Sequence, residues 1–286
     1  MYQTSSLPYW IFSLVLLLLW IYVASCFGKD VFFNLYVNRV RTLLFRPVTW
    51  VQNVAPKCPE WLAAAILLVL VLLLRGALAK AIEAPLDQSF GDTVLVADMA
   101  SFKKTAMFAT LSLLLLVCKI NVIRMVMCWR FGEKTRSSVV ECLCTATSPL
   151  SALPLKRSAI ATSIAFLAIS SAMLFVSGHT YTPRGTIAII ANPGVYLALK
   201  LTLFAIADVL LFLRTLIIAL FIVQIVGILS ANRTAIGMAG EWFNEISRVF
   251  VNRPAIVGML DLTPLIAMLL LGFAHGIAIS LINTIF

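Results

Sequence analysis

The sequence predicts an all-α, polytopic membrane protein with about six transmembrane helices, arranged as three hairpins with interfacial helices in the linkers. Three observations lead to this fold class: the composition, the lengths of the apolar runs and the distribution of basic residues. Hydrophobic residues make up 62% of the 286 residues and charged residues 12%, and the mean hydropathy is +1.02. A soluble domain of this size could not keep so much apolar surface from water.

Six apolar runs are long enough to cross a hydrocarbon core of about 30 Å, which takes about 20 helical residues. They lie at 9–27, 61–79, 108–129, 158–178, 200–229 and 262–284. The first could also be a secretory signal peptide, but residues 1–10 contain no Lys or Arg and 25–28 is a poor cleavage site, so we expect a retained helix. The stretch 195–229 is roughly 50 Å long as one helix and is expected to tilt, break or project from the bilayer.

The basic residues indicate the orientation. The connections after the first, third and fifth runs carry thirteen Lys and Arg residues, against about five on the opposite side. The positive-inside rule then places these three connections in the cytoplasm and both termini outside. We therefore attribute the net charge of +10 to topology and to contact with anionic lipid headgroups, and not to nucleic-acid binding.

The inner connections contain stretches typical of helices that lie in the headgroup plane. From 33 to 54 apolar residues recur at helical spacing with Arg39, Arg41 and Arg46 between them, and 241–250 has the same character. The alternative for both stretches is an ordinary surface loop. The order of long helix, basic linker and long helix occurs three times, either as an internal repeat or as a consequence of six-helix topology alone.

The third of these units carries the residues of a family pattern. Arg248 and Pro254 lie in its linker, and Asp261, Thr263 and Pro264 open its last helix. With these residues it resembles the YggT (YlmG) family of bacterial and plastid membrane proteins. The repeat of that family pairs two helices across a linker with proline, arginine and proline, followed by aspartate and Ser/Thr-Pro. Locally, Asp261 is expected to cap the last helix and Pro264 to occupy its first turn.

The first unit keeps part of the same pattern. Pro47 and Pro56 have the nine-residue proline spacing, and Glu60 is the nearest acidic counterpart of the aspartate. The chain therefore resembles an expanded, three-unit member of the family. The predicted segments are a first YggT-like hairpin at 1–80, an outer connection at 81–107, a second hairpin at 108–178, an outer connection at 179–199 and a third, best-matching hairpin at 200–286.

The resemblance implies a non-enzymatic membrane scaffold or assembly factor, linked to envelope organisation, osmotic tolerance or the maturation of membrane complexes. It implies the bacterial inner membrane or a related plastid membrane, no cofactor, and a protein partner or a homo-oligomer. In that function Arg41, Arg46, Arg248 and Arg253 are expected to contact the partner or anionic lipids.

The residues themselves give no sign of catalytic chemistry. The sequence contains no phosphate-binding GxxxxGK[ST], HExxH or GxSxG motif, so we expect no catalytic residues and no metal site. Of six cysteines only Cys142 and Cys144 are close together, which is too few for a zinc site, and all are expected to be reduced. His179 and His275 could be haem ligands from two helices, but their positions favour hydrogen-bonded structural roles.

Charged residues inside the apolar runs suggest the main alternative function. Asp208 and Arg214 lie in the fifth run, and Lys119, Asn121 and Arg124 in the third, where an unpaired charge costs at least about 2.5 kcal/mol. In one interpretation Asp208 sits near the outer headgroups, Arg214 bonds a neighbouring helix end and Arg124 extends to the inner surface. In the other, these three residues line a polar path, and the chain is a channel or transporter for an ion or small solute. A third possibility is a small integral subunit of a larger membrane complex.

Overall fold

The computed structural model describes residues 7–28, 34–81, 86–98, 100–132, 137–181, 187–189, 194–250, 256–257, 260–261 and 263–286. Within these ranges the chain has nine α-helices, a 3-10 turn (η2, Leu150–Ala152) and two small antiparallel sheets. Five helices are long and apolar enough to cross a membrane. The predicted all-helical membrane fold is therefore confirmed.

The long helices correspond to the six predicted apolar runs. They are α1 (Leu7–Ser25), α3 (Glu60–Ala81), α4 (Phe102–Phe131), α6 (Leu155–Val176), α7 (Val195–Leu229) and α9 (Thr263–Ile285). The described apolar part of α1, Ile11–Ser25, is shorter than the other five candidate spans. Helix α7 is a single, unbroken helix of 35 residues, so the expected break is wrong. Tilting and projection from the bilayer stay predictions.

Three shorter helices connect the long ones in pairs. They are α2 (Leu35–Val54) between α1 and α3, α5 (Ser138–Ala146) between α4 and α6, and α8 (Arg233–Phe250) between α7 and α9. The two long helices of each pair contact one another. The stretches that were predicted as interfacial helices or loops, 33–54 and 241–250, are thus helical wherever they are described. The order of elements is the same in all three units, while an internal sequence repeat stays a prediction.

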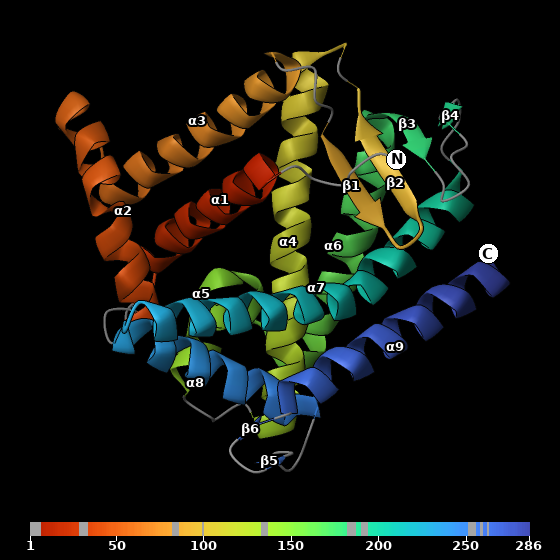
Figure 1. Cartoon of the computed structure of the whole chain (residues 1–286). Coiled ribbons are helices and arrows are strands. Elements are labelled where there is room, and N and C mark those ends of the chain that lie inside the picture. The colour runs from red at the N-terminus through yellow and green to blue at the C-terminus, as the bar shows by residue number, and fades with distance from the viewer. Residues whose placement is uncertain are drawn as a thin grey trace.

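The short helices and the larger sheet lie at opposite ends of the bundle (Figure 1). In this view helix α2 lies along the left edge with α5 and α8 below it, and the four-stranded sheet lies at the upper right, near the first turn of α7 and the last of α9. Helix α4 stands nearly upright, and α7 and α9 run side by side obliquely across it. The end with the short helices is the one that the basic residues assign to the cytoplasm.

The four-stranded sheet was not predicted. It consists of β1 (Asp87–Phe90), β2 (Thr93–Ala97), β3 (Ser177–Tyr181) and β4 (Ile187–Ile189), paired in this order. Two strands come from each of the two outer connections, so the sheet forms only when distant parts of the chain meet. A second, two-stranded sheet pairs β5 (Ile256–Val257) with β6 (Leu260–Asp261).

The first outer connection, predicted at 81–107, overlaps the start of a long helix. Helix α4 begins at Phe102, six residues before the predicted start of the second hairpin. Lys103 and Lys104 lie in its first turn, and Lys104 forms an ion pair of 2.8 Å with Asp98. The two lysines lie before the apolar run at 108–129 but belong to the same helix, because a helix can extend past the hydrocarbon core into water.

The turn between β1 and β2 packs into the helix bundle. Phe90 is fully buried in one core cluster with Phe108 of α4, Phe166 of α6 and Phe204 of α7. The next residue, Gly91, has a φ of +56°, and a Cβ atom there would lie 2.6 Å from Phe204 and 2.7 Å from Ile279 of α9. Both the left-handed backbone and the close contact require glycine.

Replacing Gly91 with alanine is expected to destabilise the protein. Overpacking costs about 1–3 kcal/mol and the left-handed backbone about 1 kcal/mol more. We expect the free energy of unfolding in mild detergent to fall by these amounts in Gly91→Ala. The matched control is Gly276→Ala on α9, where no heavy atom lies within 4 Å of the added carbon. Equal stability of the two variants would show that the turn does not pack between α7 and α9.

Candidate functional site

A cluster of ionisable side chains is buried between the long helices. Asp208 of α7 is 4% exposed, and its Oδ1 lies 3.1 Å from Nε2 of His275 on α9. Its Oδ2 lies 3.9 Å from Nζ of Lys119 on α4. The backbone N–H of Gly91 donates to both carboxylate oxygens, at 3.3 and 3.1 Å. One carboxylate thus joins three helices and the β1–β2 turn, and we call this group the Asp208 cluster.

The Asp208 cluster lies deep in the apolar part of the molecule. His275 is near the middle of the 23-residue helix α9, and Asp208 is about 20 Å along α7 from its first residue. Whether Asp208 sits near the outer headgroups stays a prediction, because its burial places the carboxylate within the protein and not relative to a membrane. Helix α7 begins at Val195, five residues before the apolar run predicted at 200, so more of the helix precedes Asp208 than the sequence suggested.

In the Asp208 cluster the charge of the buried carboxylate is balanced by the groups around it. A buried carboxylate is retained in an apolar interior only when cations and hydrogen-bond donors surround it. Lys119 supplies the cation, Gly91 donates a backbone N–H, and the imidazole of His275 can donate a hydrogen bond to the carboxylate. The hydrogen-bonded structural role expected for His275 agrees with this contact, and its carboxylate partner was not foreseen.

A second polar network connects α4 and α6. Arg124 is 4% exposed, and its guanidinium donates to Asn121 Oδ1 and to Ser158 Oγ, each at 2.8 Å. Asn121 in turn donates to Thr162 Oγ1 at 2.7 Å. The expectation that Arg124 extends to the inner surface is wrong, because the hydroxyl groups of α6 face it inside the bundle.

Arg214 has different surroundings from both networks. Its side chain is exposed, and its guanidinium lies against α9 at Gly272, where a Cβ atom would be 3.3 Å from Nη1. The predicted path of Asp208, Arg214 and Arg124 is therefore not brought together as one site. The structure instead groups Asp208 with Lys119, His275 and Gly91. The sequence signal for this grouping was the presence of a lysine and a histidine within apolar runs.

The short helices form a second candidate site at the end of the bundle opposite the four-stranded sheet, which is the predicted inner end. Tyr36 of α2 donates to Glu241 of α8, and burial together with this bond raises the pKa of the tyrosine. Ser137, which caps α5, donates to Glu245 of α8 at 2.6 Å, and Asn34, which caps α2, donates to the main chain of α5 at 2.7 Å. These bonds join α2, α5 and α8 across the three units, and we call these three helices together the short-helix layer.

The predicted contact residues in this region differ in their accessibility. Arg46 is exposed on α2. Arg41 is engaged within the protein, since it forms a 2.7 Å ion pair with Glu60 and lies 5.5 Å from the centre of the Tyr22 ring. Arg253 and the side chain of Arg248 lie outside the described residues.

The proline pattern is partly visible. Pro47 lies inside α2, and Pro56 comes two residues after its end. Pro264 is in the first turn of α9, as predicted, and Thr263 is the first residue of that helix. The main chain of Asp261 pairs in β6, two residues before α9 begins, and its side chain and all of Pro254 lie outside the described residues.

The remaining candidates do not form a site in the described part of the chain. His179 belongs to β3, and its side chain is not described. All six cysteines are free thiols, and burial raises the pKa of Cys142 to about 12, which keeps this thiol protonated. Among the described residues no three His, Cys, Asp or Glu side chains are grouped so that they could hold a metal ion.

Comparison with protein-family models, curated proteins and solved structures finds no match for this chain. The resemblance to the YggT family therefore stays a prediction that rests on the motif residues.

The charge pairing in the Asp208 cluster can be measured by a double-mutant cycle. Asp208→Asn and Lys119→Met each leave a buried charge without its partner, and each is expected to lower the free energy of unfolding by about 3 kcal/mol or more. The double variant should lose less than the sum, with a coupling of about 0.5–3 kcal/mol. Arg214→Met, on the same helix as Asp208 but exposed, should be additive with Lys119→Met. Additivity of the Asp208 and Lys119 changes would contradict the pairing.

Proposed function

We propose that this chain is a non-enzymatic membrane scaffold or assembly factor, which offers a fixed surface to anionic lipids and to a membrane-protein partner at the cytoplasmic face. The observation that carries the proposal is the short-helix layer. Because its three helices are bonded to each other as well as to their own long helices, the surface is formed before any partner arrives. Preorganisation of this kind reduces the entropy lost on binding.

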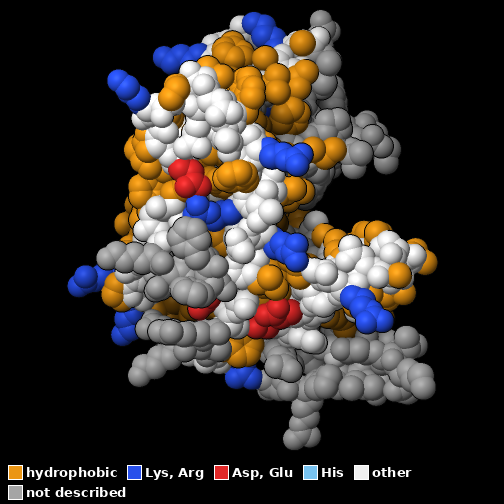
Figure 2. Space-filling view, turned by 90° about the vertical axis from the view of Figure 1, so that its left-hand side faces the viewer, with side chains coloured by type: hydrophobic (Ala, Val, Ile, Leu, Met, Phe, Trp, Pro, Cys, Tyr) orange, Lys and Arg blue, Asp and Glu red, His pale blue; other side chains and the backbone are white. Residues whose placement is uncertain are grey.

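Helix α2 supplies the best-described part of this surface. Leu43, Trp50 and Val54 are exposed by 65%, 64% and 72%, and their spacing places them on one stripe of the helix. Arg39 and Arg46 lie beside this stripe, seven residues apart, and are also exposed. Figure 2 shows this side of the molecule, where basic side chains lie among hydrophobic ones. Such a helix fits the membrane interface, with apolar residues towards the acyl chains and arginines at the phosphates.

The proposal assigns the contact to Arg39 and Arg46, together with Arg248 and Arg253 of the third linker. Arg41 is removed from the predicted set, because its charge is already neutralised by Glu60. A resemblance to the YggT family supports the same kind of function.

Neutralising the exposed arginines of α2 tests this proposal. Each basic residue near an anionic surface contributes about 1 kcal/mol, so we expect Arg39→Gln/Arg46→Gln to reduce retained anionic phospholipid about thirtyfold. Native mass spectrometry of the protein in mild detergent measures the lipid and any partner that copurifies. Lys103→Gln, an exposed change at the opposite end of the bundle, is the control and should have no effect. Unchanged retention of lipid and partner in the double variant would contradict the proposal.

Transport of an ion or small solute is the second candidate function, and the Asp208 cluster is the observation that favours it. Ionisable residues within membrane helices commonly mark ion or proton pathways, and here a carboxylate, an amine and an imidazole meet between helices.

Flux through liposomes tests this second function. Transport through the Asp208 cluster predicts that the reconstituted chain moves protons or K⁺, detected with a pH-sensitive dye or a K⁺ electrode, and that Asp208→Asn abolishes the flux. Arg214→Gln, outside the cluster, should retain it. A wild-type protein without proton or K⁺ flux would leave only the scaffold proposal.

A further inference from the structure

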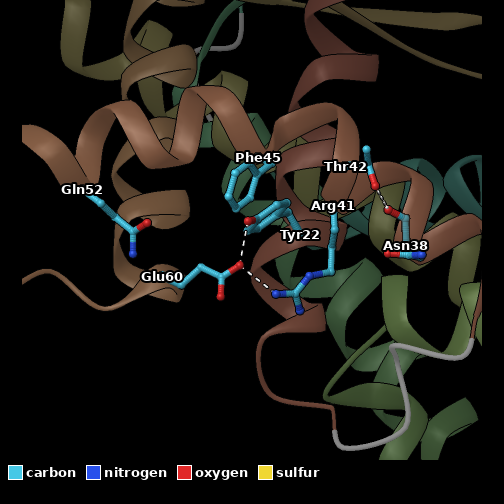
Figure 3. A pocket seen from close by; sticks show the side chains of 7 residues that line it. All are labelled: Tyr22, Asn38, Arg41, Thr42, Phe45, Gln52 and Glu60. Atoms are coloured by element: carbon cyan, nitrogen blue, oxygen red, sulfur yellow. Dashed lines mark hydrogen bonds and ion pairs between the residues drawn. The ribbon is translucent and has the colours of Figure 1, made fainter.

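An open groove of about 320 Å³ lies at the inner end of the first unit (Figure 3). Tyr22 near the end of α1 and Glu60 at the start of α3 form one side, and polar and aromatic residues of α2 form the other. The groove therefore lies where two long helices meet the short-helix layer, which is the depth of lipid headgroups in a membrane.

The groove contains one positive and one negative group in direct contact. The phenol of Tyr22 and the guanidinium of Arg41 both donate to the same oxygen, Glu60 Oε1, each at 2.7 Å. Figure 3 shows the second carboxylate oxygen of Glu60 pointing away from both donors. The side chain of Glu60 is 40% exposed and that of Arg41 15%, so a ligand in the groove can reach both charges.

This charge balance selects among lipid headgroups. A purely anionic headgroup would gain from Arg41 but would meet the carboxylate of Glu60. A zwitterion that carries a phosphate and an ammonium group can satisfy both residues at once. A primary ammonium has N–H groups for the outward oxygen of Glu60, whereas a quaternary ammonium has none.

We propose that this groove binds the phosphoethanolamine headgroup of a membrane phospholipid. Its phosphate lies at Arg41, beside the hydroxyl of Thr42 and the amide of Asn38, and its ammonium group at the outward oxygen of Glu60. Phe45, which lines the groove and is 59% exposed, contacts the glycerol and the first acyl carbons.

The residues around Glu60 support the placement at the membrane interface. Trp61 follows Glu60 directly, is 41% exposed, and its ring centre lies 5.7 Å from that of Phe27. Tryptophan is enriched where headgroups meet the hydrocarbon core. Beyond Trp61, Leu62, Ile66 and Val69 are exposed along α3 and provide an apolar surface for the acyl chains.

The site rests on the same placement of α2 at the inner membrane surface as the proposed function, but it uses different residues. Arg39 and Arg46 are exposed on α2 and do not line the groove. Failure of the scaffold proposal is therefore distinguishable from failure of the lipid site. Arg39→Gln/Arg46→Gln tests the former and changes at Glu60 the latter.

The experiment uses the full chain in nanodiscs made from equal amounts of phosphatidylethanolamine, phosphatidylcholine and phosphatidylglycerol. After release from the nanodisc, native mass spectrometry measures the lipids that remain bound. We expect phosphatidylethanolamine to exceed each of the other two by about tenfold or more, in keeping with one charge-assisted hydrogen bond. Glu60→Gln should abolish this preference and increase retention of phosphatidylglycerol, because the carboxylate that accepts the ammonium and opposes an anionic headgroup is gone. Lys103→Gln, an exposed change at the opposite end of the bundle, is the control and should keep the preference for phosphatidylethanolamine.

A wild-type series avoids dependence on the folding of the variants. Retention should persist when the ethanolamine nitrogen is methylated once or twice and fall at the third methylation, because only the quaternary nitrogen lacks an N–H donor while the positive charge stays. Equal retention across this series would overturn the proposal. A folded Glu60→Gln protein that keeps the preference for phosphatidylethanolamine would overturn it too.

Discussion

A polar group inside a bilayer must find its partners within the protein, because hydrocarbon offers none. Asp208 shows what this constraint does to the fold. Its carboxylate takes one contact each from α4, α9 and the β1–β2 turn, so α7 can pack in only one position relative to these elements. The turn enters the bundle as far as Gly91 because its backbone N–H is one of those contacts, and glycine is what allows Phe204 and Ile279 to close around it.

The same constraint acts at three depths and joins the three helix pairs. Arg124 and the hydroxyl groups of α6 hold the second pair together, and the Asp208 cluster connects the second pair to the third. At the inner end the short-helix layer connects all three through Tyr36, Asn34 and Ser137. The described helices therefore form one connected body and not three independent hairpins. A fixed body of this kind suits a surface on which other molecules assemble.

Basic residues at the inner end divide into two kinds that composition does not distinguish. Arg39 and Arg46 project from α2 beside an exposed apolar stripe, whereas Arg41, on the same helix, turns towards Tyr22 and Glu60. The helical period decides this, since residues two positions apart point in different directions and Arg41 faces the groove. Arg39 and Arg46 remain available to anionic headgroups. Arg41 forms an ion pair with Glu60 that has no net charge, and a zwitterionic headgroup can complement this pair.

The sequence by itself determined the membrane class, the six long helices, the helical character of α2 and α8, and Pro264 in the first turn of α9. Apolar run length, helical periodicity and helix-start residues are local properties, so they can be recognised without knowing the fold. Only the tertiary structure decided that Asp208 meets His275 and Lys119, that Arg124 is buried, that Arg41 pairs with Glu60, and that two outer connections combine into one sheet. The physical reason is that a buried polar group or an unpaired strand is satisfied by whatever the fold brings beside it, and the partner comes from a segment that no local pattern identifies.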